Sequence, residues 1–122
     1  MKTIKVSEAT SIQLDWLVAK CNGDFALYHN IEEGQRFLNL WTGSAFLKYS
    51  TLWSCGGPII ERERLCARPL KEVWGCWVTD LYGDIHALSL SGFGPTPLIA
   101  AMRCYVSSKF GDEVAVPDEL LS

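Results

Sequence analysis

The stretch that most constrains the fold of this chain runs from Thr96 to Gly111, because it carries both the start and the stop signals of a helix. The Thr96 hydroxyl can cap a helix, and Pro97 suits the first turn. Gly111 is a typical residue just past a helix end. The sequence therefore predicts a helix over residues 97–110, with an apolar face that needs a surface to pack against.

A second helix is predicted over residues 11–21. Four apolar residues recur there at the spacing that lines one helix face, namely Leu14, Leu17, Val18 and Cys21. The Asn22-Gly23 pair that follows supplies a stop. From residue 24 to residue 43 no period is sustained, and no element is predicted.

The middle of the chain predicts β-structure. Residues 44–60 are rich in aromatic residues, threonine and isoleucine, and glycines interrupt them, which predicts a strand, a glycine loop and a second short strand. Residues 72–79 and 85–91 flank turn chemistry at residues 82–84, which predicts an antiparallel hairpin. The tail after Gly111 is expected to run as an extended segment or to form a last short turn.

These elements predict an α+β fold, in which a small antiparallel sheet packs against two main helices. The sheet is expected to combine residues 46–60 with the hairpin at 72–91. A length of 122 residues and a hydrophobic content of 48% fit one folded domain over residues 1–122.

Composition excludes several classes of function. The formal net charge of -3 gives no overall positive field, which argues against nucleic acid as a partner. No apolar run is long enough for a signal peptide or a membrane span, so no membrane contact is expected. The five cysteines contain no C-x-x-C pair, and only two histidines are present, so neither a disulfide framework nor a metal site is predicted.

The first candidate binding site is the predicted glycine loop of residues 50–58. Glycine lets backbone N–H groups point at an anion, an indole can stack on a flat ring, and hydroxyls can fix orientation. The candidate ligand-binding residues of this loop are Ser50, Thr51, Trp53, Gly56 and Gly57. The alternative is a tight turn between strands with Trp53 as ordinary core.

Two further places could contribute to such a site. Arg62 follows the loop on a predicted strand, where Glu61 and Glu63 would share the opposite side or pair with neighbouring basic residues. Gly94 and Thr96 precede the helix at 97–110, whose N-terminus is receptive to phosphate or carboxylate. Arg103 lies at the margin of the apolar face of that helix, either reaching a ligand or keeping its charged head in water.

Three blocks of this sequence together resemble the NinX-like family of lambdoid phages and prophages. They are LDWLVAKC at residues 14–21, YSTLWSCGGPIIERE at 49–63, and PLIAAMRCYVSSKFGDEVAVPDEL at 97–120. The resemblance implies phage origin and residence in the cytoplasm of the bacterial host, and it carries over no catalytic residue.

By analogy with small phage proteins that act against host processes, the sequence suggests a non-catalytic protein without cofactor that sequesters a phosphorylated, nucleotide-derived host defence signal. The alternative is a module that binds a host or phage replication or defence protein, because the many large aromatic residues could anchor an interface or line a homo-oligomer contact. An enzyme that processes nucleotides would rest on Glu61, Glu63 and Asp84 as acids.

Overall fold

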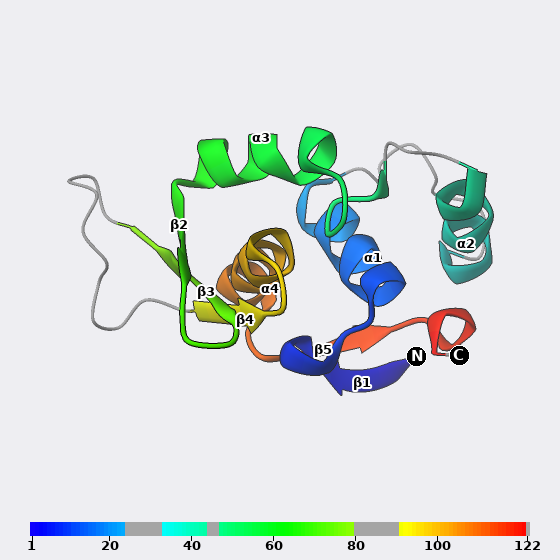
Figure 1. The fold of residues 1–122 in the computed structure, drawn as a ribbon. Helices are drawn as coiled ribbons and strands as arrows, with labels where there is room; N and C mark the ends of the chain where they lie inside the picture. The colour runs from blue at the N-terminus through cyan, green and yellow to red at the C-terminus, as the bar shows by residue number, and fades with distance from the viewer. Residues whose placement is uncertain (24–32, 44–46, 80–90, 122) are drawn as a thin grey trace.

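The structure is a computed structural model that describes residues 1–23, 33–43, 47–79 and 91–121. These residues form an α+β fold, as the sequence predicts, with four α-helices and two small antiparallel sheets. Helix α4 (Pro97–Phe110) lies at the centre, between a three-stranded sheet and helix α1 (Ser11–Cys21) (Figure 1). Helix α3 (Trp53–Glu63) crosses above α4 and α1 in this view.

Both predicted helices are confirmed, and each is capped by a threonine. The Thr96 hydroxyl accepts the backbone N–H of Ile99 at 3.1 Å at the start of α4. At the start of α1, Thr10 and Gln13 form a reciprocal capping box, in which each side chain binds the backbone N–H of the other residue. These local bonds explain why sequence alone locates both helix starts.

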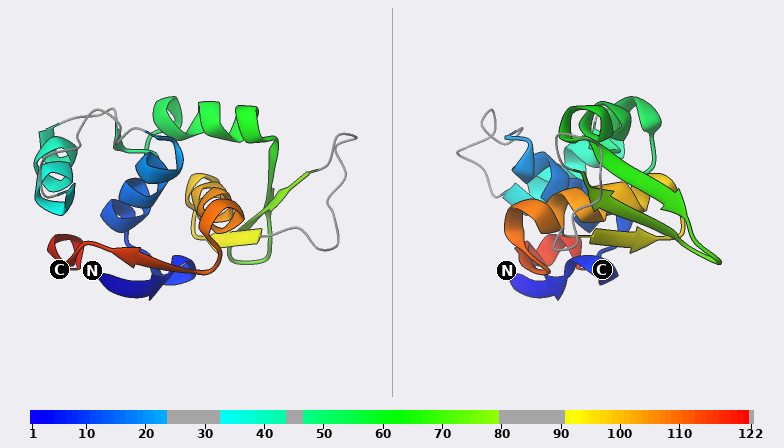
Figure 2. Two further views of the ribbon diagram at one scale, coloured as in Figure 1. Left: turned by 180° about the vertical axis from the view of Figure 1, so that it is seen from behind. Right: turned by 90° about the vertical axis from the view of Figure 1, so that its left-hand side faces the viewer.

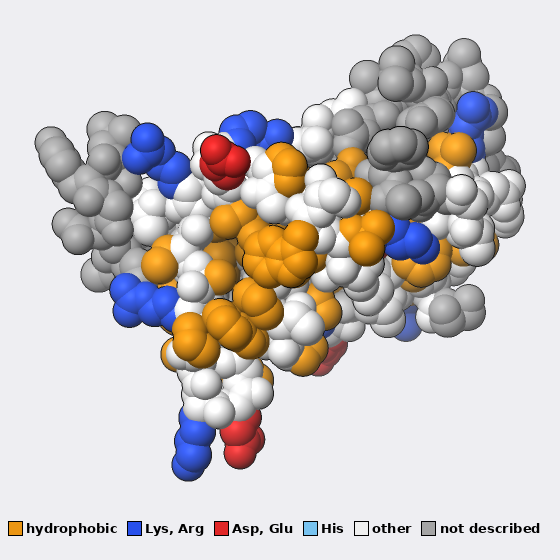
Figure 3. Space-filling view, turned by 45° about the horizontal axis from the view of Figure 1, so that its top comes forward, with side chains coloured by type: hydrophobic (Ala, Val, Ile, Leu, Met, Phe, Trp, Pro, Cys, Tyr) orange, Lys and Arg blue, Asp and Glu red, His pale blue; other side chains and the backbone are white. Residues whose placement is uncertain are grey.

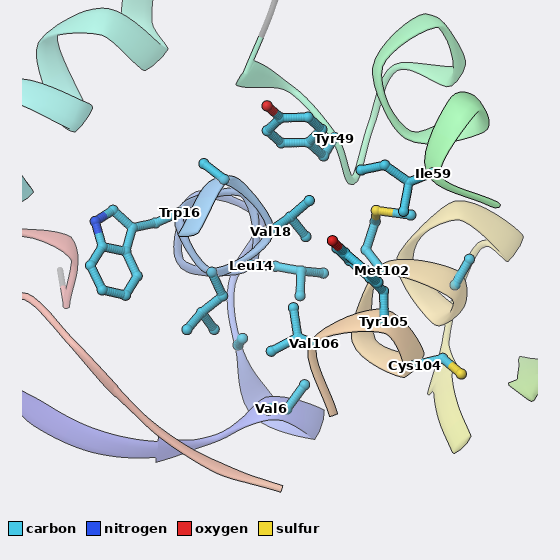
Figure 4. Close-up of a cluster of buried hydrophobic side chains, with 14 of the residues drawn as sticks. Val6, Leu14, Trp16, Val18, Tyr49, Ile59, Met102, Cys104, Tyr105 and Val106 are labelled. Carbon is cyan, nitrogen blue, oxygen red and sulfur yellow. The ribbon is translucent and has the colours of Figure 1, made fainter. Parts of the chain in front are cut away.

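The core lies between these two helices. Leu14 and Val18 of α1 point toward Met102 and Val106 of α4, and all four side chains are buried (Figure 4). Trp16 is also fully buried but points to the other side of α1 (Figure 4). Apolar contacts on both sides make α1 an internal helix and not a surface one.

The predicted strand, glycine loop and strand over residues 44–60 is wrong, because residues 53–63 form helix α3. Glycine and proline normally disfavour a helix, but here a contact with distant residues outweighs that preference. A Cβ on Gly56 would collide with the Tyr49 carbonyl oxygen and come within 2.6 Å of Leu98 Cδ1, so glycine is needed where α3 crosses α4. Pro58 lies on the exposed side of the helix. The packing of Gly56 and Ile59 outweighs the free-energy cost of a proline inside a helix.

The three-stranded sheet has the order β2 (Leu65–Pro69), β3 (Trp74–Val78), β4 (Ser91–Gly94), with antiparallel neighbours. Strand β3 confirms the first half of the predicted hairpin. Its partner in the structure is β4, at the end of the predicted second strand, and residues 85–90 lie outside the described residues. Residues 46–60 give no strand to this sheet in their described part. Strands β2 and β4 are the two edge strands of this sheet, and β2 directly follows the end of α3.

The second sheet joins the two ends of the chain. Strand β1 (Lys2–Lys5) pairs with β5 (Glu113–Val116), and a 3-10 turn follows each, η1 (Val6–Glu8) and η4 (Asp118–Leu120). The tail thus combines the two conformations expected of it, since it is extended and then ends in a short turn.

Helix α2 (Glu33–Gly43) was not predicted. It stands apart from the central helices in Figure 1 and packs on η4, where a Cβ on Gly34 would collide with the Glu119 side chain. Phe37 is its buried anchor, and Trp41 packs against the core. Because a glycine takes one of the inward positions, the apolar period of this helix is broken in the sequence.

Candidate functional site

A groove of about 430 Å³ lies beside β4 and the C-terminal half of α4. It is bordered by the residues that join β1 to η1 and by those that join α4 to β5. The lining residues are Lys5, Val6, Ser7, Ser91, Gly92, Phe93, Arg103, Ser107, Asp112 and Glu113. Its size falls in the range of small-molecule sites.

Arg103 is the central residue of this groove. Its Nη1 donates to the Phe93 carbonyl at 2.8 Å, and its Nη2 donates to the Ala9 carbonyl at 3.1 Å. The Nε atom is buried and has no hydrogen-bond partner in the described structure. Burial lowers the pKa of the guanidinium from its usual value. Arg103 therefore ties β4 and Ala9, two residues before α1, to α4, and keeps one donor unused.

The remaining polar lining is mixed in charge. Lys5 and Arg103 are basic, Asp112 and Glu113 are acidic, and three serines bring hydroxyls, namely Ser7, Ser91 and Ser107. Ser107 is itself buried in the wall of the groove. A ligand that combines an anionic group with hydrogen-bond donors would suit this lining.

Among the sequence-predicted ligand residues, the structure brings Gly94 and Arg103 together at one edge of this groove. A Cβ on Gly94 would lie 2.7 Å from Ile99 Cγ2 and 3.3 Å from Arg103 Nη1, so a side chain would crowd the contact of β4 with α4. The Thr96 hydroxyl is engaged in capping α4. The N-terminus of α4 and the groove are thus adjacent features.

The other predicted ligand residues lie elsewhere. Leu98 contacts Gly56 and Tyr105 contacts Arg62, and by helical periodicity this side of α4 is opposite Arg103 and Ser107. The block that was expected to be a glycine cradle comprises Ser50, Thr51, Trp53, Gly56 and Gly57. Of these residues, Trp53, Gly56 and Gly57 belong to α3, so no such loop exists.

Each of these residues has a definite place. Ser50 is buried, and its backbone N–H donates to Asp15 Oδ1 at 2.7 Å. Thr51 is exposed, and Trp53 is 56% exposed, with its Cε3 atom 3.8 Å from where a Cβ added at Gly57 would lie. Thr51 and Trp53 therefore contribute to the surface at the start of α3.

Arg62 and Glu63 lie in the last turn of α3, not on a strand. The Arg62 Nε donates to Glu63 Oε2 at 3.0 Å, and Nη2 donates to the Tyr105 hydroxyl at 3.2 Å. The hydrogen bond from Arg62 lowers the pKa of Glu63, and Lys109 adds to the effect at 3.2 Å. Glu63 is thereby held ionised in an ion-pair cluster. Asp84, the third acid considered for catalysis, lies outside the described residues.

Sequence reasoning missed Asp15, which is a fully buried carboxylate on α1. It accepts the Trp41 indole N–H at 2.8 Å in addition to the backbone N–H of Ser50. Burial raises its pKa, while these hydrogen bonds and nearby Lys48 lower it, with a net rise. A single acidic residue in an apolar helix pattern is normally interpreted as facing solvent. Only the tertiary structure brings the Trp41 indole and the Ser50 backbone to Asp15.

Comparison with known protein families identifies the family of the chain. The model of a family described as "Bacteriophage P22, NinX" matches residues 5–109, most of the chain. The chain belongs to this family. The match confirms the resemblance stated above and makes the chain a phage accessory protein. The NinX match includes the residue blocks 14–21 and 49–63. It ends at residue 109, inside the third block, which spans residues 97–120.

Among curated proteins, no sequence matches this NinX-family member. Within the described ranges, no helix has the length and hydropathy needed to cross a membrane. The same ranges contain no group of three or more histidine, cysteine or acidic residues placed to hold a metal ion. Both histidines, His29 and His86, lie outside these ranges.

Proposed function

We propose that this phage protein is a non-catalytic binder that acts in the cytoplasm of the bacterial host and sequesters a small nucleotide-derived molecule in the groove at Arg103. The observation that carries the proposal is the combination at one site of a buried, unused Arg103 Nε donor with a lysine, three hydroxyls and two carboxylates.

The chemistry of a nucleotide fits this lining. A phosphate would bind the basic groups, Lys5 and Arg103, in charge-assisted hydrogen bonds. Amino or sugar hydroxyl groups would donate to Asp112 and Glu113, and Phe93 offers an aromatic neighbour. In the part of the chain that the structure describes, no hydrogen bond joins a serine of this lining to Lys5, Asp112 or Glu113, which favours retention over turnover.

The first experiment is native mass spectrometry of the protein purified from its bacterial host, followed by denaturing extraction of anything bound. Titration with a panel of nucleoside monophosphates and cyclic dinucleotides by calorimetry then supplies an affinity. Lys5→Gln should weaken binding about 10-fold, because it removes one charged hydrogen-bond donor. Lys2→Gln, the same change on the same strand outside the groove, should leave the affinity unchanged.

A bare protein that binds no member of the panel would contradict the proposal. So would equal losses in both lysine variants. A released molecule that differs chemically from the one added would point instead to an enzyme.

A second candidate function, a protein-binding module, is favoured by the exposed apolar start of α3. Trp53 is 56% exposed and follows Leu52, which is also exposed. Figure 3 shows hydrophobic side chains in a band across the face that α3 occupies, bordered by lysine and arginine side chains. A complex with a host protein that persists in gel filtration and is lost in Trp53→Ala, but not in Phe110→Ala, would support this function.

A further inference from the structure

The three-stranded sheet has two unlike faces. A Cβ on Gly92 would collide with the backbone of Cys104, so this face of the sheet packs directly on α4. Cys76, the cross-strand partner of Gly92, is fully buried on the same side. Side chains alternate along a strand, so the residues between these positions point to the opposite face. The right-hand view of Figure 2 looks onto that opposite side, with α4 behind the sheet.

The strand register defines what the opposite face presents. One cross-strand row holds Cys66, Trp77 and Ser91, and the next holds Arg68, Gly75 and Phe93. The Trp77 ring lies over Gly75, because a Cβ there would come within 2.5 Å of Trp77 Cη2 and 3.1 Å of Leu70 Cδ1. The absence of a side chain at Gly75 lets the indole lie flat on the sheet.

Two aromatic rings form the centre of this face. The centroids of Trp77 and Phe93 lie 5.8 Å apart with the rings perpendicular. Phe93 is 46% exposed and Leu70 is 44% exposed. Each is a large apolar side chain left in contact with water, so this face has the composition of a binding surface and not of a solvated one.

Among the described residues, the charge on this face has one sign. Arg68 is exposed and is the only charged residue among the six register positions, and it makes no ion pair in the described structure. Arg64, also exposed, precedes β2 by one residue. Of the residues that the structure describes, the acids nearest to these arginines along the chain are Glu63, in α3, and Glu72, in the β2–β3 turn. The face is therefore locally basic, although the whole chain is acidic.

We propose that this sheet face binds single-stranded nucleic acid. Unpaired bases would stack on the exposed Phe93 ring and the adjoining Trp77, and the phosphate backbone would bind Arg68 and Arg64. A duplex hides its base faces and needs a broad positive field, which the net charge of -3 does not supply. A second copy of this chain packed face to face would place like charges of Arg68 together. Ser91 and Phe93 also line the groove at Arg103, so the two proposed sites share β4, whereas Arg68 belongs only to the sheet face and Lys5 only to the groove.

The test uses fluorescence anisotropy of a labelled single-stranded thymidine oligonucleotide with the full chain at low salt. Phe93→Ala should weaken binding about 5- to 100-fold through the loss of one stacking ring. Phe93→Trp should retain binding, since it restores a ring at the same place. Arg68→Gln should reduce the dependence of log affinity on log salt by about 0.7, as expected for one lost phosphate contact on a single strand.

Two controls match these variants. Phe110→Ala removes an equally exposed ring at the end of α4, and Lys2→Gln removes one positive charge from β1, so both should bind as the unchanged protein does. Circular dichroism checks that Phe93→Ala folds. The proposal is overturned by a flat anisotropy up to about 100 µM protein, the weak limit of nonspecific contacts. Equal binding of a duplex, equal losses in the controls, or a photo-crosslinker at position 93 that joins only a polypeptide would overturn it as well.

Discussion

At the scale of single residues, Asp15 is the most unusual group in the described structure. A carboxylate that is fully buried on an internal helix costs free energy unless hydrogen bonds compensate it. Here Trp41 and the backbone of Ser50 donate to it, and each donor comes from a segment far along the chain. Asp15 therefore joins α1, α2 and the segment before α3.

The raised pKa of Asp15 predicts a pH-dependent stability. Because its pKa in the folded protein lies above the usual value near 3.8, the folded state binds this proton more tightly than the unfolded state. The contribution of Asp15 to the free energy of unfolding is thus complete below pH about 4 and is lost as pH rises through the folded pKa.

Urea unfolding of the unchanged protein and of Asp15→Asn at a series of pH values measures this contribution. The asparagine is uncharged at every pH, so the free energy of unfolding of the unchanged protein should fall relative to that of the variant as pH rises above about 4. A difference that stays constant, or grows with pH, would show that desolvation does not dominate at this site.

At the scale of elements, α3 shows how a close contact overrides local propensity. Gly56 and Gly57 are neighbours in one helix and have the same intrinsic cost there. Only Gly56 meets another backbone, at Tyr49, whereas the nearest atom to a Cβ on Gly57 would be Trp53 Cε3 at 3.8 Å.

This contrast predicts opposite effects of the same substitution. Gly56→Ala should lower the free energy of unfolding by about 2 kcal/mol or more, since the added methyl overpacks the contact with Tyr49 and Leu98. Gly57→Ala should raise it by up to about 1 kcal/mol through helix propensity. Chemical denaturation of the two variants provides the comparison, and equal effects would contradict the close crossing of α3 over α4.

At the scale of the whole molecule, stability is expected to be uneven. Helix α4 contacts the three-stranded sheet and three other helical segments, α1, α3 and η1. Helix α2 instead rests on η4 and α1, with Trp41 bonded to Asp15. Local opening should therefore begin at α2, while α4 should open only with global unfolding.

Amide hydrogen exchange followed by mass spectrometry tests this order. Peptides from residues 33–43 should exchange faster than those from residues 97–110. Trp41→Phe, which removes the bond to Asp15 and keeps an aromatic ring, should accelerate exchange in α2 and leave α4 nearly unchanged. Faster exchange in α4 than in α2 would refute the proposed hierarchy.

The sequence by itself determined the α+β class, helix α1 with its stop, helix α4 with its Thr96 cap, strand β3 and membership of the NinX family. These features depend on interactions between residues close in the sequence, such as the hydrogen bond that the Thr96 hydroxyl accepts from the Ile99 backbone N–H. Such interactions can be predicted from the sequence because both partners lie in one short segment. Of the predicted ligand residues, Gly94 and Arg103 are near each other in the structure, because one precedes α4 and the other lies within it; that they bind a ligand stays a prediction.

Only the tertiary structure decided the rest. Gly34 and Gly56 interrupt the apolar periodicity that predicts a helix. In the structure, each glycine permits a close approach between a helix and a distant segment. Whether the carboxylate of Asp15 faces water or a buried indole depends on partners 26 and 35 residues away. Likewise, the groove at Arg103 and the aromatic sheet face assemble from segments that no local period connects, because long-range packing and not propensity brings them together.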